Sequence, residues 1–61
     1  MKYITILDFE TGEVHIFPYK DKYGEDFAEI VEGIQQDLQE VFDFSEYNCQ
    51  WMIGELKLKI H

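Results

Sequence analysis

The chain of 61 residues carries 13 aspartates and glutamates against five lysines and no arginine, which gives a formal net charge of −8. Protein affinity for nucleic acid comes largely from cations that neutralise phosphates, and arginine is the preferred residue for bidentate contacts, so this composition excludes nucleic acid and anionic membrane surfaces as expected partners. One cysteine excludes a disulfide within the chain, and one cysteine with two histidines makes a zinc site of the usual kind unexpected.

The length predicts a single small α+β domain spanning residues 1–61, with marginal stability, because so short a chain buries only about 60% of its unfolded surface. Aromatic residues make up 16% of the chain, so a dense core or association with a second copy is the expected source of stability. No stretch approaches the roughly 18 apolar residues of a membrane span, and the first residues become charged too soon for a signal peptide. Together with the single cysteine, these features predict a cytoplasmic protein.

Residues 2–9 and 14–19 are rich in β-branched and aromatic side chains, and they predict two antiparallel strands joined by a tight turn. Gly12 supplies the positive φ that a two-residue loop, Thr11-Gly12, requires. A three-residue loop with a bulge would shift the register by one residue and remains an alternative. Pro18 has no N–H to donate, so the second strand is expected at an edge of the sheet. The two-residue loop predicts the register Phe9 opposite Val14, Asp8 opposite His15, Leu7 opposite Ile16 and Ile6 opposite Phe17.

Residues 26–42 carry the pattern of an amphipathic helix, because their apolar side chains fall in one arc about 120° wide and their acidic side chains fall opposite. Asp26 and Glu29 have the spacing of a capping box, with aspartate in place of serine or threonine. The apolar arc consists of Phe27, Ile30, Val31, Ile34, Leu38, Val41 and Phe42.

Residues 49–53 and 56–61 predict a second hairpin, because Gly54-Glu55 suits a type II′ turn, which requires glycine first. In that hairpin Trp51 faces Leu58, on an apolar face directed at the helix. The predicted fold is therefore ββαββ: a four-stranded, mostly antiparallel sheet with one amphipathic helix packed on one face.

No group of residues predicts a catalytic site, so we expect a protein that is not an enzyme and has no cofactor. Ser45 lies among acidic residues with no histidine near it in the sequence, which is typical of a turn or capping residue. Cys49 falls beside Trp51 on the apolar face of a predicted strand, where a buried and inert thiol is expected.

The two histidines, His15 and His61, fall at strand positions, and with Asp8 and Glu13 they offer ligands for a weak metal site at most. The predicted register places His15 directly opposite Asp8, and a cross-strand ion pair is the simpler interpretation. No metal site is therefore expected.

The acidic side of the helix is the main candidate for function, because nine carboxylates and only one lysine lie between Asp21 and Glu46. Single-sign fields steer association, so this side predicts a basic protein partner, such as a site built for nucleic-acid phosphates; a purely solubilising surface is the alternative. Gly33 falls within the acidic arc, where close approach of a partner backbone or neutral drift explains it. The expected contact residues are Glu25, Asp26, Glu29, Glu32, Gly33, Gln36, Asp37 and Glu40.

The first hairpin is apolar on both faces, and a single helix can cover only one of them. An uncovered apolar face often marks an association site, so a homodimer is the second functional hypothesis. The residues expected in that interface are Ile4, Ile6, Phe17, Tyr19 and Met52.

Overall fold

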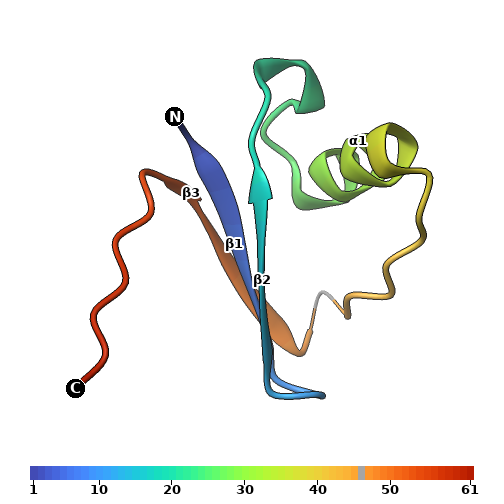
Figure 1. Cartoon of the computed structure of the whole chain (residues 1–61). Helices are drawn as coiled ribbons and strands as arrows, with labels where there is room; N and C mark the ends of the chain where they lie inside the picture. Colours follow the sequence, from blue (N-terminus) through green and yellow to red (C-terminus); the bar gives the residue numbers. More distant parts are fainter. Residues whose placement is uncertain (46) are drawn as a thin grey trace.

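The computed structural model describes residues 1–45 and 47–61. The protein is an α+β fold in which a three-stranded antiparallel sheet, in the order β2-β1-β3, carries one helix on one face (Figure 1). Among the described residues, no helix has the length and apolar character needed to cross a membrane. The elements are β1 (Tyr3–Asp8), β2 (Glu13–Pro18), the short 3-10 helix η1 (Asp21–Tyr23), α1 (Phe27–Leu38) and β3 (Cys49–Gly54).

The first hairpin forms as predicted, but its loop has four residues and both predicted registers are wrong. The last cross-strand pair is Asp8 with Glu13, and Gly12, at a φ of 75°, donates its N–H to the Asp8 carbonyl at 2.9 Å. The Asp8 carboxylate accepts a further bond from the Glu10 N–H at 3.0 Å, which stabilises the longer loop. The register differs from the two-residue-loop prediction by two residues. Because this is an even number, side chains of the two strands that were predicted to share a face of the hairpin still share one.

The core lies between β1 and α1, and this arrangement contradicts the prediction that Ile4 and Ile6 face away from the helix. Both side chains are fully buried. β1 is the central strand, where Ile4 lies between Phe17 and Ile53, and Ile6 lies between His15 and Trp51. The buried cluster consists of Ile4, Ile6, Tyr23, Phe27, Ile30 and Ile34.

The helix begins after Asp26 as predicted but ends at Leu38, one turn before the predicted end. Asp26 adopts an extended N-cap conformation without a side-chain capping bond, so the predicted capping box is not formed. Gln39 adopts the left-handed conformation, with a φ of 53°, and its N–H bonds the Gln35 carbonyl, which ends the helix. Phe42 then returns to the core, and its N–H donates to the Gln35 side chain at 2.8 Å.

The predicted fourth strand, and with it the ββαββ order, is not confirmed. β3 pairs with β1 as an antiparallel strand, but residues 55–61 have no secondary structure and run away from the sheet (Figure 1). Leu58 and Ile60 are 69% and 95% exposed. A type II′ turn requires a positive φ at its first glycine, and Gly54 instead ends β3 without one, so the predicted second hairpin does not form.

Candidate protein-binding surfaces

The face of the sheet opposite α1 has no covering layer among the described residues, and we call it the open sheet face. It presents no charged side chain at any of its nine strand positions, although 30% of the chain is charged. Thr5, near its centre, is already buried by neighbouring side chains. The nine residues of the open sheet face are Tyr3, Thr5, Leu7, Val14, Ile16, Pro18, Gln50, Met52 and Gly54.

The apolar side chains of the open sheet face remain accessible to solvent. Val14 and Met52 are 55% and 56% exposed, and Leu7 and Ile16 are 38% and 36% exposed. A shallow groove of about 210 Å³ lies over β1 and β3, lined by Thr5, Leu7, Gln50, Trp51 and Met52. The face is therefore apolar, neutral and slightly hollowed, as expected of a surface that packs against another apolar layer.

An uncovered apolar face was expected, but the structure builds it from other residues. Of the five predicted residues only Met52 lies on it. Ile4 and Ile6 are in the core, while Phe17 and Tyr19 pack against the core from the helix side. Most of the residues that were not predicted occupy the alternate positions of β1 and β2, and the other two, Gln50 and Gly54, flank Met52 on β3. In β1 and β2 only the choice of face, which the sequence leaves open, separates the two sets.

Asp37, one of the predicted partner-binding acids, is bound within the molecule instead. Its Oδ1 accepts from Lys22 Nζ at 2.8 Å, and its Oδ2 accepts from Lys20 Nζ at 3.0 Å and from the Tyr23 hydroxyl at 2.6 Å. The Lys22 hydrogen bond, followed by those from Tyr23 and Lys20, holds the pKa of Asp37 well below its usual range. Burial, together with the bond to Asp37, raises the pKa of Tyr23 to about 12.

Gly33 is explained by packing inside the molecule. A Cβ atom at Gly33 would overlap Tyr23 Cδ1 and lie 2.9 Å from Cε1. The Tyr23 ring is held in that place by its hydroxyl bond to Asp37. Neither a partner backbone nor neutral drift, the two explanations suggested by the sequence, is needed to account for Gly33, because η1 packs its tyrosine against this side of the helix.

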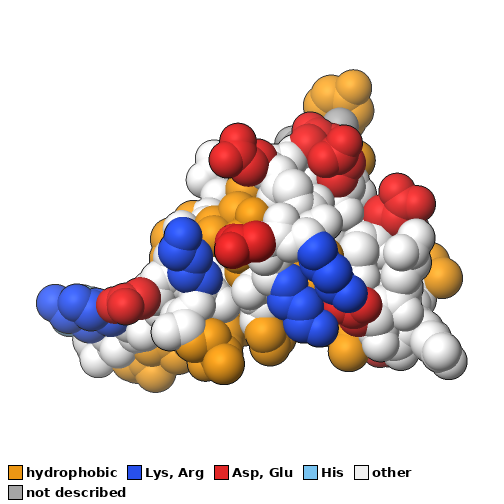
Figure 2. All heavy atoms as spheres, turned by 90° about the horizontal axis from the view of Figure 1, so that it is seen from above, with side chains coloured by type: hydrophobic (Ala, Val, Ile, Leu, Met, Phe, Trp, Pro, Cys, Tyr) orange, Lys and Arg blue, Asp and Glu red, His pale blue; other side chains and the backbone are white. Residues whose placement is uncertain are grey.

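The other acids of the predicted acidic side are exposed, as expected. Figure 2 shows both acidic and lysine side chains on the surface of the protein as seen from above. Within the described residues, ion pairs of lysine are made only with Asp37. Gln36 is also exposed, and Glu46 lies outside the described residues. Five exposed carboxylates without an ion pair in the described chain form what we call the acidic patch: Glu25, Asp26, Glu29, Glu32 and Glu40.

The predicted ion pair between His15 and Asp8 is absent, because the register places Ile6 opposite His15. His15 Nε2 instead lies 3.4 Å from Glu13 Oε1 on the same strand. Asp8 and Glu13 are cross-strand partners, so all three polar side chains lie at the loop end of the helix-facing side of the sheet.

Comparison with protein-family models, with curated protein sequences and with solved structures finds no significant match. The chemistry of the surfaces described above is therefore the basis for assigning function.

Proposed function

We propose that the protein is a small non-enzymatic protein-binding module that self-associates through its open sheet face. The observation that carries this proposal is the absence of charge from all nine positions of that face in a chain with a net charge of −8. Two such chains repel each other over most orientations. Contact between two open sheet faces brings no charged strand side chain against another, so a second copy is the partner that this surface fits best.

The dimensions of the face set the strength of the expected contact. Three strands of six residues make a footprint of about 14 by 20 Å, from strand spacings near 4.8 Å and rises near 3.3 Å. A footprint of this size corresponds to the small and weak class of protein interfaces. A two-fold contact would pack the two sheets face to face and bury Val14, Ile16 and Met52 in both copies.

Sedimentation velocity over a range of concentrations tests the proposal. We expect dimers at high concentration, and we expect Val14→Lys to weaken the dimer about tenfold or more, because a lysine would be buried without a partner. Val41→Lys is the matched control, since Val41 is 86% exposed and lies outside the sheet. It introduces the same charge and should leave the dimer unchanged. A wild-type protein that stays monomeric at every concentration contradicts the proposal.

A second candidate function uses the acidic patch, which supports binding to a basic protein surface. The specific observation is that its five carboxylates are exposed and have no ion pair within the described chain, whereas Asp37 is held by two lysines. Proteins that bind this chain at low salt should be basic, and they should dissociate as the salt concentration is raised. Glu32→Lys should weaken capture, and Glu55→Lys, on the extended segment, should not. Binding that changes neither with salt concentration nor in the Glu32→Lys variant contradicts this function.

A further inference from the structure

Three potential metal ligands meet at the loop end of the first hairpin. One ligand atom each from Asp8, Glu13 and His15 lies within 4.8 Å of the other two. Asp8 and Glu13 are brought together as cross-strand partners, and His15 follows two residues later on the same face of β2. The register of the first hairpin is therefore what brings the three ligands together.

The distances in the cluster fit a tetrahedral ion. Zinc binds histidine nitrogen and carboxylate oxygen at about 2.0–2.2 Å, so two ligand atoms of one tetrahedral zinc lie about 3.3–3.6 Å apart. His15 Nε2 and Glu13 Oε1 are separated by 3.4 Å, which is already that spacing. The ligand atom of Asp8 lies within 4.8 Å of both, close enough for one ion to be held by all three residues.

We propose that Asp8, Glu13 and His15 bind a divalent transition-metal ion of the zinc class, with water completing the coordination. Three protein ligands and an open position are the arrangement of an accessible zinc site. Glu13 is largely exposed, with a side-chain exposure of 62%, so an ion and its water can reach the cluster from solvent.

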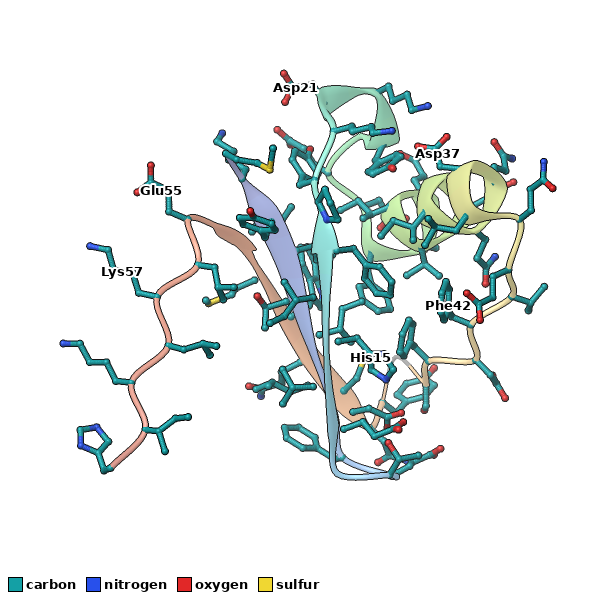
Figure 3. All side chains as sticks on the ribbon, viewed as in Figure 1. His15, Asp21, Asp37, Phe42, Glu55 and Lys57 are labelled. Carbon is teal, nitrogen blue, oxygen red and sulfur yellow. The ribbon has the colours of Figure 1, made fainter. Side chains whose placement is uncertain are left out.

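The surroundings hold two of the ligands in place. The His15 ring packs between Phe17, stacked at 6.2 Å, and the edge of Phe44 at 5.0 Å. It projects from β2 toward the chain that follows α1 (Figure 3). Asp8 is buried, and its Oδ1 accepts the Glu10 N–H, which orients the carboxylate as an outer-shell partner orients a metal ligand.

The charge of the cluster favours a cation. Two carboxylates face each other across the hairpin, and the lysine ion pairs of the described residues are all made with Asp37. The third donor is an imidazole nitrogen, which suits zinc, copper and nickel rather than magnesium or calcium. The site should therefore distinguish Zn²⁺ from Mg²⁺, which a cluster of carboxylates alone would not do.

Isothermal titration of the 61-residue chain with Zn²⁺ tests the site. We expect one zinc ion per chain and an affinity that falls about tenfold or more in Glu13→Gln, since changes even outside the ligand shell cost this much. Glu32→Gln is the matched control, because it removes the same charge from an exposed glutamate of α1 and should change affinity by less than about twofold in moderate salt. Equal loss in both variants overturns the proposal, because it would indicate diffuse attraction to an acidic protein.

Nuclear magnetic resonance of the two imidazoles provides a readout besides affinity. Zn²⁺ should shift the Nε2 resonance of His15 and leave His61 unchanged, and Mg²⁺ at the same concentration should shift neither. A shift confined to His61, or equal responses to Zn²⁺ and Mg²⁺, contradicts the proposed ligand set. The proposal is independent of self-association, because Val14→Lys changes the other face of β2 and should leave zinc binding intact.

Discussion

At the scale of single residues, the contact between Tyr23 and Gly33 explains the most about this chain. A glycine in the middle of a helix lowers helix stability by about 1 kcal/mol relative to alanine. Its presence in α1 therefore calls for a structural explanation. Here the tyrosine ring occupies the space of the missing Cβ, and its hydroxyl reaches Asp37, which also binds Lys20 and Lys22 (Figure 3). Glycine therefore allows η1 to dock on α1 and to neutralise one carboxylate of the acidic segment.

The substitution Gly33→Ala should destabilise the protein by about 1–3 kcal/mol, because overpacking outweighs the gain in helix propensity. Denaturant unfolding measures the change. Gly54→Ala is the matched control and should be close to neutral, since a Cβ there meets no atom within 4 Å. In a Tyr23→Ala background, Gly33→Ala should instead stabilise the fold by about 1 kcal/mol. Stabilisation by Gly33→Ala in the wild-type background would contradict the packing account.

At the scale of elements, the sequence predicts the presence of strands and helix better than the way they pair. The content of β-branched and aromatic residues identifies β1 and β2, and the arc of apolar residues identifies α1, because both are local properties of the chain. Which face of β1 meets the helix depends on the pairing of Ile4 with Ile53 and of Ile6 with Trp51, contacts between residues far apart in sequence. The interface residues were missed for this reason. The three residues of the His15 cluster were considered together from the sequence, but the four-residue loop that places Asp8 opposite Glu13 was not predicted.

The extended segment offers a prediction at the same scale. Removing residues 57–61, which are all exposed, should lower the melting temperature of the monomer by less than about 4 °C. Leu58→Asp should lower the melting temperature equally little. Ile53→Asp, which places a charge against the core, should lower it strongly. If the truncation or Leu58→Asp destabilises the protein as much as Ile53→Asp, the segment packs as the fourth strand that the sequence predicts.

At the scale of the whole molecule, one helix covers one side of a three-stranded sheet and leaves the other side apolar and uncharged. A folded chain of this size buries a limited share of its surface, so a second layer would add to its stability. The acidic patch and the open sheet face lie on opposite sides of the sheet. A dimer formed through the sheets would therefore present two acidic patches outward.

The most direct test of self-association through the open sheet face is the concentration dependence of the backbone amide resonances of the isotope-labelled protein. On dilution from millimolar to low micromolar concentration, we expect the resonances of Thr5, Leu7, Val14 and Ile16 to shift together. The resonances of α1 should stay in place. Shifts confined to α1, or no shift at any concentration, would contradict the account.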